Sequence, residues 1–377
     1  MKSKKFLAIF AFVAMATACK KKPLDENEIR IGEFGSMTGT EATFGLSTHN
    51  GILLVVDEIN ARGGINGKKL RLISLDDQGK AEEAQLAVQR LVTQDKVHVI
   101  LGEVASSRSL AAAPVAQRYK VPMISPSSTN PKVTEVGDYI FRVCFTDPFQ
   151  GKVLAKFAAE DLKAKTAALL IDTKSDYSVG LAEFYRKTFA ELGGKIVIEQ
   201  NYVGGDIDFK GQLTAIKAKN PDVVVVPGYY TEAGLILKQA RELGIKGPVL
   251  GGDGWDSPKL FEIAGKAGDN SYISNHYSVE DKDPKVQAFI KAYQARFKEI
   301  PDGLAVMGYD AALVLEDAIK RAKSLKGEDL RDAIAQTKRF SAVTGTITID
   351  EQRNAAKPAV VLKIESGNWK FARRVEP

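Results

Sequence analysis

The chain contains two related stretches, QDKVHVILGEVAS at residues 94–106 and AKNPDVVVVPGYYT at residues 218–231. Each places a polar turn before an apolar run and a glycine within two residues of its end, and these glycines, Gly102 and Gly228, are 126 positions apart. A continuous apolar run is typical of a strand that helices cover on both faces of a sheet. We therefore expect each stretch to end a buried parallel strand and to lead through a loop into a helix.

The similarity extends to both sides of these stretches. Two further pairs match in the same order: residues 59–75 with 190–200, and residues 119–126 with 244–253. Gly64 matches Gly194 at an offset of 130, and Pro122 matches Pro248 at an offset of 126. Three ordered matches at a nearly constant offset indicate an internal repeat. The sequence therefore predicts two similar lobes.

Strand and helix patterns alternate along both halves of the chain. We expect strands at 28–34, 70–75, 97–101, 167–171, 196–199 and 223–226, and helices at 46–61, 81–93, 181–192, 209–218 and 233–243. Alternation of this kind is typical of parallel βαβ units. The predicted fold class is therefore α/β, with a doubly wound parallel sheet in each lobe.

The repeat also identifies the loops that would face a ligand. In open parallel sheets, ligands bind beyond the carboxyl ends of the strands. These loops are residues 102–107 and 125–129 in the first lobe, and 228–231 and 251–255 in the second. If the lobes face each other, the four loops line one interlobe cleft, a favoured place for small ligands.

The two sets of loops differ in chemistry. The first-lobe loops are rich in hydroxyls, and Ser106 lies where a helix is expected to begin, an arrangement that suits a carboxylate. Ser106 could instead serve only as the helix N-cap. The second-lobe loops offer Tyr229 and Asp253, and the loop DTKSDYSVG adds Tyr177. An anion site facing an acid and aromatic rings fits an amino acid, unless Asp253 is merely a turn residue.

No catalytic, cofactor or metal pattern is present in the sequence. The histidines are His49, His98 and His276, and His98 lies in an apolar strand, which favours a core position. GxSxG, GxxxxGK[ST] and HExxH are all absent. We therefore expect a binding protein with no cofactor, and not an enzyme.

The N-terminus predicts export. Residues 1–18 combine lysines, the apolar stretch FLAIFAFVAMA and small residues before Cys19, as a secretory signal does. The ending resembles a bacterial lipobox, with Ala16 where leucine is usual, so we expect lipidation at Cys19 and a tether over residues 19–27. An ordinary cleaved signal with a chance cysteine is the alternative. The expected location is periplasmic and membrane-tethered.

Charge and cysteine content follow from this leader. The formal net charge is +6, but residues 1–22 hold six lysines and no acid, so the remaining chain has equal numbers of basic and acidic residues. This balance argues against nucleic acid as a partner. Cys19 and Cys144 are the two cysteines. A lipidated Cys19 would leave Cys144, in the apolar strand YIFRVCF, as a free structural thiol.

Several motifs together resemble the leucine/isoleucine/valine-binding proteins of ABC importers, within the type I periplasmic binding proteins. The resemblance covers Glu28 to about Trp369 and rests on IGEFGSMTGTEATFG, VVDEINARGGINGKKLRLISLDD, GEVASSRS, VPMISPSSTNP and PGYYTEAGLILKQARELG. It implies that Ser106 and Thr129 bind the α-carboxylate, with Ser127 in a backbone-contacting position, and that Asp253 binds the α-ammonium. By the same resemblance, the ligand-binding aromatic residues are Tyr177, Tyr229 and Phe44.

The resemblance further implies a hinge of three segments between the lobes. Lobe 1 would comprise residues 28–146 and 279–345, and lobe 2 residues 147–278 and 346–377. A monomer would close on an amino acid and deliver it to an ABC permease in the membrane. Two alternatives remain open: a ligand-sensing lobe protein, and a binder of amides or organic acids on the same fold.

Overall fold

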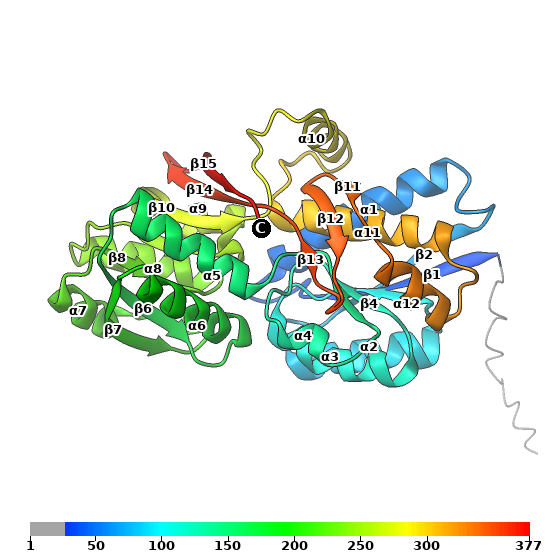
Figure 1. Ribbon diagram of the computed structural model, residues 1–377, viewed down its shortest axis with the longest axis horizontal. Helices are drawn as coiled ribbons and strands as arrows, with labels where there is room; N and C mark the ends of the chain where they lie inside the picture. The colour runs from blue at the N-terminus through cyan, green and yellow to red at the C-terminus, as the bar shows by residue number, and fades with distance from the viewer. Residues whose placement is uncertain (1–26) are drawn as a thin grey trace, which may run out of the picture.

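The computed structural model describes residues 27–377, which form two lobes lying side by side (Figure 1). The first lobe is built on a sheet of order β2-β1-β3-β4-β5, in which every neighbouring pair is parallel. Its strands are β1 (Glu28–Gly35), β2 (Lys69–Asp76), β3 (Val99–Leu101), β4 (Met123–Ser125) and β5 (Ile140–Arg142). The signal and tether predicted over residues 1–26, including Cys19, lie outside the described residues.

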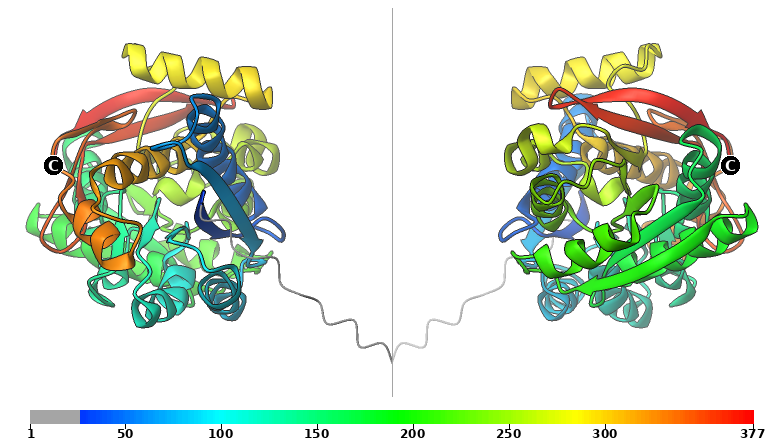
Figure 2. Two further views of the ribbon diagram at one scale, coloured as in Figure 1. Left: turned by 90° about the vertical axis from the view of Figure 1, so that its right-hand side faces the viewer. Right: turned by 90° about the vertical axis from the view of Figure 1, so that its left-hand side faces the viewer.

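Helices cover both faces of this first sheet. They are α1 (Ala42–Ala61), α2 (Ala81–Arg90), α3 (Ser106–Tyr119), α4 (Lys132–Glu135), α10 (Pro284–Phe297), α11 (Gly303–Arg321) and α12 (Gly327–Ala335). Strand β3 shows why its residues are all apolar: Val99 and Leu101 enter one hydrophobic core, while Ile100 enters the core on the opposite face. Helix α10 lies outermost, at the top of both views in Figure 2.

The second lobe repeats the first. Its strands β6 (Thr166–Asp172), β7 (Lys195–Tyr202), β8 (Val223–Val225), β9 (Val249–Gly251) and β10 (Ser271–Asn275) are ordered β7-β6-β8-β9-β10, the pattern of the first sheet. The helices are α5 (Asp147–Lys156), α6 (Asp176–Glu191), α7 (Lys210–Lys219), α8 (Tyr230–Glu242) and α9 (Pro258–Ala264). The predicted fold class is therefore confirmed, including the internal repeat.

Strands β14 (Ala359–Glu365) and β15 (Asn368–Val375) extend the second sheet in an antiparallel sense, which the repeat did not predict. Some helix bounds also differ from expectation. Helix α1 begins at Ala42 and not at 46, because Gly45 allows its first turn to approach Ser36 closely: a Cβ there would lie 2.3 Å from the Ser36 carbonyl oxygen. Helix α6 begins at Asp176 and not at 181, because the Ser175 side chain caps it by accepting from the Ser178 N–H.

Three segments pass between the lobes. The first lies between β5 and α5, and the second between β10 and α10. The third follows a small antiparallel sheet of β11 (Phe340–Ala342), β12 (Gly345–Ile349) and β13 (Ala355–Ala356), and Figure 1 shows the chain passing from β13 to β14. Ile347, Ile349 and Ala355 belong to the first-lobe core. We therefore propose residues 357–358 as the third crossing, later than the expected boundary after residue 345.

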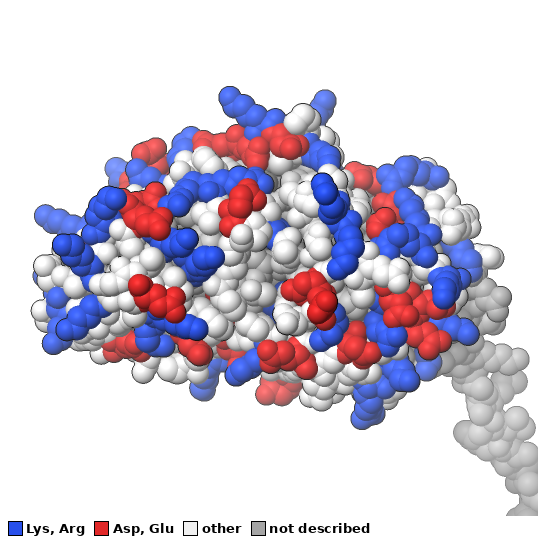
Figure 3. Space-filling view, viewed as in Figure 1, with Lys and Arg blue, Asp and Glu red and all other residues white. Residues whose placement is uncertain are grey.

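The described surface carries mixed charge. Figure 3 shows basic and acidic side chains interspersed over both lobes on the face drawn. No helix within residues 27–377 has both the length and the apolar character needed to span a bilayer.

Cys144 is unpaired and fully buried beside the first crossing. Its Sγ donates to the Ser128 carbonyl oxygen at 3.3 Å, and burial raises the pKa of the thiol to about 12. Because the thiolate is the reactive form, we expect a thiol reagent at pH 8 to label the native protein slowly and the unfolded protein fast. Labelling followed by mass spectrometry of a Cys19→Ser variant tests this. Equal rates in the two states would contradict the buried position.

Candidate functional site

The two lobes touch directly across the cleft. The Ser107 hydroxyl at the start of α3 donates to Asp176 Oδ2 at 2.8 Å, and the Asp176 N–H donates back to Ser107 Oγ at 3.0 Å. Thr231 of α8 donates to the Thr40 carbonyl oxygen at 2.9 Å. These bonds join loops of opposite lobes, so the structure represents a closed cleft.

A small interlobe cavity lies inside this closed cleft, with about 10 Å³ of free space between its walls. Its lining residues come from both lobes and from the first turn of α11: Val104, Ser127, Tyr177, Tyr229, Asp253, Gly254 and Leu304. The lining of the interlobe cavity therefore combines polar and apolar groups from both lobes.

Ser106 is the first residue of α3, and the N-cap position is held by Ala105, which offers no side-chain bond. The alternative that Ser106 serves as the N-cap is therefore wrong. Its Oγ accepts from the Asn130 N–H at 3.2 Å, which ties the two hydroxyl-rich loops together. Since a hydroxyl has one proton to donate, Ser106 can still donate that proton to a ligand.

Ser127 and Thr129 carry buried hydroxyls that lack a hydrogen-bond partner of normal geometry among the described residues. A buried polar group without a partner costs about 1–3 kcal/mol. Behind their loop, the fully buried Arg142 guanidinium donates to the carbonyl oxygens of Ser128 and, at 2.7 Å, of Asn130. The loop is thus held by its carbonyl groups, while the Ser127 hydroxyl remains available.

Asp147, which the sequence reasoning missed, is a fully buried acid near Thr129 at the start of α5. Burial, with a further contribution from the Asp253 charge, raises the pKa of Asp147 to about 8, while the Thr129 hydroxyl acts in the opposite direction. The side chain is therefore mainly protonated at neutral pH. A neutral Asp147 leaves Asp253 as the acid that lines the interlobe cavity.

Asp253 lies in a short turn after β9, and its carboxylate accepts three hydrogen bonds. Oδ1 accepts from Gln150 Nε2 at 2.7 Å and from the Tyr177 hydroxyl at 3.0 Å, while Oδ2 lies 3.0 Å from His276 Nε2. A carboxylate has about four lone-pair positions. Asp253 therefore has room for one further donor from the cavity, and its side chain does more than shape the turn.

Aromatic rings form one wall of the cavity. Tyr177 and Tyr229 stack in parallel, with centroids 5.4 Å apart and 2° between their planes. Phe44 is fully buried and packs edge-on against Tyr229 at 5.2 Å and Tyr230 at 5.1 Å. Phe44 therefore supports the tyrosine wall from behind and is not among the residues that line the cavity.

Four of the seven predicted site residues line the cavity: Ser127, Tyr177, Tyr229 and Asp253. Ser106 and Thr129 lie in the adjoining loops. The sequence reasoning missed Val104 and Leu304, which supply the apolar lining, and Gln150 and His276, which bond to Asp253. Val104 lies within loop 102–107, so the repeat could have identified it, whereas Leu304 follows the repeat and carries no such signal.

Two further expectations from the sequence concern His98 and metal binding. His98 is half-buried, and its Nδ1 accepts from the Arg30 N–H of β1, which is a structural bond. Within residues 27–377, no cluster of His, Cys, Asp or Glu side chains could hold a metal ion.

Residues 28–368 match the family model described as periplasmic binding protein. The chain belongs to this family. A relative in Pseudomonas aeruginosa, the leucine-, isoleucine-, valine-, threonine-, and alanine-binding protein, is 33% identical over 90% of this chain and 91% of its own length. Since the family and its curated relatives are binding proteins, the expectation of a binding protein and not an enzyme is confirmed.

Solved structures of similar sequence share the fold of this periplasmic binding protein. The leucine binding protein LivK from Thermotoga maritima has a TM-score of 0.89 and 39% identity, covering 93% of this chain and 99% of its own. LivJ from Streptococcus pneumoniae, in complex with isoleucine, has a TM-score of 0.88 and 37% identity, with coverage of 93% and 100%. The resemblance to branched-chain amino acid binding proteins of ABC transporters is therefore confirmed.

Proposed function

We propose that this protein captures a branched-chain amino acid in the interlobe cavity and delivers it to an ABC permease. The observation that carries the proposal is the composition of that cavity: Ser127 on one side, the Asp253 carboxylate on the other, and the apolar Val104 and Leu304 between the lobes. A free α-amino acid presents a carboxylate that could pair with Ser127, an ammonium group that could pair with Asp253, and a side chain that could contact Val104 and Leu304.

The first-lobe hydroxyls would bind the α-carboxylate. Ser106, Ser127 and Thr129 each have a proton to donate, and the N-terminus of α3 adds free backbone N–H groups and a favourable dipole. Donors of this kind bind an anion without bringing a full positive charge into the site. A carboxylate would also give the unpartnered hydroxyl of Ser127 the hydrogen bond that it lacks.

Asp253 would bind the α-ammonium through its remaining lone-pair position. Its three donors, Gln150, Tyr177 and His276, hold the buried carboxylate in place. The apolar lining favours a hydrocarbon side chain over a charged one, because a buried unpaired charge is strongly unfavourable. The names of the relatives in Pseudomonas, Thermotoga and Streptococcus support the same ligand class.

Transport then follows from closure of the lobes. A ligand that touches both lobes binds the closed form more tightly than the open form, and it shifts the population by that difference in affinity. The permease would recognise the closed form and release the amino acid. Asp253 also weighs against the alternative of amides or organic acids, because those ligands bring no positive charge to it.

A thermal-shift screen with the twenty amino acids tests the proposal. A ligand at 100 times its Kd stabilises the folded protein by about 2.7 kcal/mol. We expect leucine, isoleucine and valine to raise the melting temperature, and aspartate and lysine to leave it unchanged. The matched control is 4-methylpentanoate, which is leucine without its ammonium group. A screen in which no amino acid raises the melting temperature would refute the assignment.

The anchoring hypothesis concerns residues 1–27. We propose that the chain is exported, cleaved before Cys19 and tethered to a membrane by lipid on that cysteine. We expect Cys19→Ser to move the protein from the membrane fraction to the aqueous fraction after a high-salt wash, with unchanged leucine binding. Sedimentation of the variant with membranes under these conditions would show that another feature holds it there.

A further inference from the structure

His276 lies at the point where the second crossing leaves the second lobe. Asn275, the residue before it, ends strand β10, while Tyr277, the residue after it, packs into the first-lobe core. The His276 side chain is fully buried and stacks on Phe145 of the first crossing, with centroids 4.1 Å apart and 24° between the planes. The imidazole is thus in contact with two of the three hinge segments.

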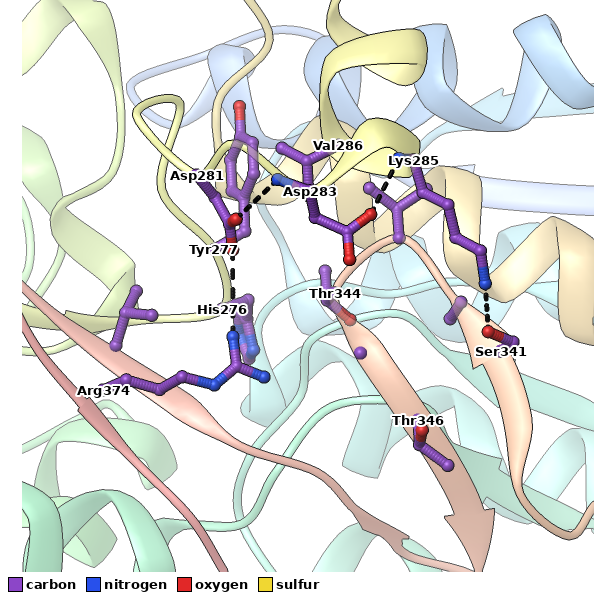
Figure 4. A pocket seen from close by; sticks show the side chains of 14 residues that line it. His276, Tyr277, Asp281, Asp283, Lys285, Val286, Ser341, Thr344, Thr346 and Arg374 are labelled. Atoms are coloured by element: carbon purple, nitrogen blue, oxygen red, sulfur yellow. Dashed lines mark hydrogen bonds and ion pairs between the residues drawn. The ribbon is translucent and has the colours of Figure 1, made fainter.

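The same residue separates two cavities. On one side it lines a hinge cavity of about 260 Å³, where Figure 4 shows it beside Tyr277. On the other side its Nε2 lies 3.0 Å from Oδ2 of Asp253, which lines the interlobe cavity. His276 therefore connects the hinge to the acid that would receive the ligand's ammonium group.

The protonation of the ring is suited to this contact. Nδ1 is buried and has no partner among the described residues, so a proton placed there would be unsatisfied. A proton on Nε2 is instead donated to Asp253, which favours the neutral Nε2–H tautomer. Burial also lowers the pKa of His276 to about 4, despite the opposing effect of Asp253.

The other two donors to Asp253 carry no charge. Gln150 and Tyr177 are neutral groups, so all three hydrogen bonds orient the Asp253 carboxylate without cancelling its negative charge. A lysine or arginine in any of these places would compete with a ligand ammonium for the same charge. The full charge of Asp253 is therefore kept for the ligand.

We propose that His276 is a positioning residue for ligand selection. It fixes the Asp253 carboxylate toward the interlobe cavity and ties that orientation to the hinge, so that discrimination between an amino acid and its deaminated analogue depends on it. The proposal rests on the proposed function, in which Asp253 binds the ammonium group.

The test uses two substitutions that differ in one property. His276→Phe keeps a flat ring stacked on Phe145 and removes the N–H donor, whereas His276→Gln restores an N–H donor without a ring. Titration calorimetry with leucine and with 4-methylpentanoate gives the ratio of the two affinities. His98→Gln, which alters a histidine outside the cleft, is the matched control.

We expect His276→Phe to bind leucine about tenfold more weakly, as loss of a hydrogen bond to a charged group predicts, and to bind 4-methylpentanoate as wild type does. His276→Gln should retain most of the wild-type ratio. If the phenylalanine variant does not fold, His276→Met replaces it in the same comparison. If His276 had a merely structural role, His276→Phe would bind both ligands more weakly by the same factor. That result would overturn the proposal.

The affinities distinguish a failure of the role of Asp253 from a failure of the role of His276 alone. A wild-type protein that binds leucine and 4-methylpentanoate equally would refute the role of Asp253, and the role of His276 with it. A wild-type protein that prefers leucine, together with a His276→Phe variant that keeps the full preference, would refute the role of His276 alone.

Discussion

Asp253→Asn will bind leucine at least tenfold more weakly than wild type while keeping its affinity for 4-methylpentanoate. Hydrogen bonds to a charged group contribute about 1.5–3 kcal/mol, and 1.4 kcal/mol corresponds to tenfold in affinity. The substitution keeps the shape of the side chain and removes the charge that would pair with the ammonium group. Leucine thus loses its ionic partner, whereas the deaminated analogue has none to lose.

The amide can be accommodated by the surrounding donors. Its oxygen can accept from Gln150 and Tyr177 as the carboxylate does, whereas its nitrogen can donate to His276 only if the imidazole proton moves to the partnerless Nδ1. Asp253→Ala would instead leave all three groups unpartnered, so it should weaken leucine binding more than tenfold and also lower stability. Asparagine is therefore the cleaner probe of charge.

Thr129→Val is the comparison on the opposite lobe. It removes one of several hydrogen-bond donors to the ligand carboxylate and adds no charge. It should therefore lower the affinities for leucine and for 4-methylpentanoate by similar factors, and the affinity for leucine by less than Asp253→Asn does. Titration calorimetry of wild type, Asp253→Asn and Thr129→Val with leucine and with 4-methylpentanoate measures these affinities. If Asp253→Asn binds every amino acid as well as wild type does, Asp253 is a turn residue and the ligand is an amide or an organic acid.

Asp310→Ala will lower the free energy of unfolding by about 3–5 kcal/mol, the range found when one member of a buried charged pair is removed. The Asp310 carboxylate in α11 is fully buried and accepts from the N–H groups of Val343 and Thr344 at 2.9 and 3.0 Å. The Thr344 hydroxyl donates to Asp310 and accepts from the buried ammonium of Lys357. Removing the acid leaves the two N–H groups and the Thr344 hydroxyl without their acceptor, and it takes the negative charge away from the buried Lys357 ammonium.

A double-mutant cycle isolates this interaction. Lys357→Met removes the buried cation, whose pKa is lowered by burial to about 8. Asp310→Ala should therefore lower the free energy of unfolding by less in the Lys357→Met protein than in the wild type. Denaturant unfolding measures all four proteins. Asp138→Ala, which removes an exposed partner of Arg331 at 2.8 Å, is the control and should cost less than about 1 kcal/mol. Equal costs for Asp310→Ala in the two backgrounds would exclude the coupling.

The internal repeat allowed the fold to be predicted in some detail. Matching stretches around Gly102 and Gly228 end β3 and β8, which occupy the same position in the two sheets. The loops after these strands supply Val104 and Tyr229 to the cavity. Local periodicity was sufficient here because each βαβ unit is contiguous in sequence and packs against its neighbours in order.

The residues that the sequence did not predict come from segments with no counterpart in the repeat. Leu304 reaches the cavity from α11, His276 lies in a crossing, and Gln150 follows another crossing. Strands β14 and β15 join the second sheet after the chain has returned from the first lobe. Such placements depend on how the lobes dock, and pairing over long sequence separations leaves no local pattern.

The hydrogen bonds between the lobes have a consequence for affinity. Ser107, Asp176, Thr40 and Thr231 join the lobes through groups that do not line the interlobe cavity. Such bonds favour the closed form even before a ligand enters, and the apparent Kd equals the intrinsic Kd divided by the fraction of competent molecules. Substitution at these rim positions can therefore strengthen or weaken retention of every ligand by one common factor. The strength of capture and the choice of cargo are thus encoded in separate sets of residues, which can evolve independently.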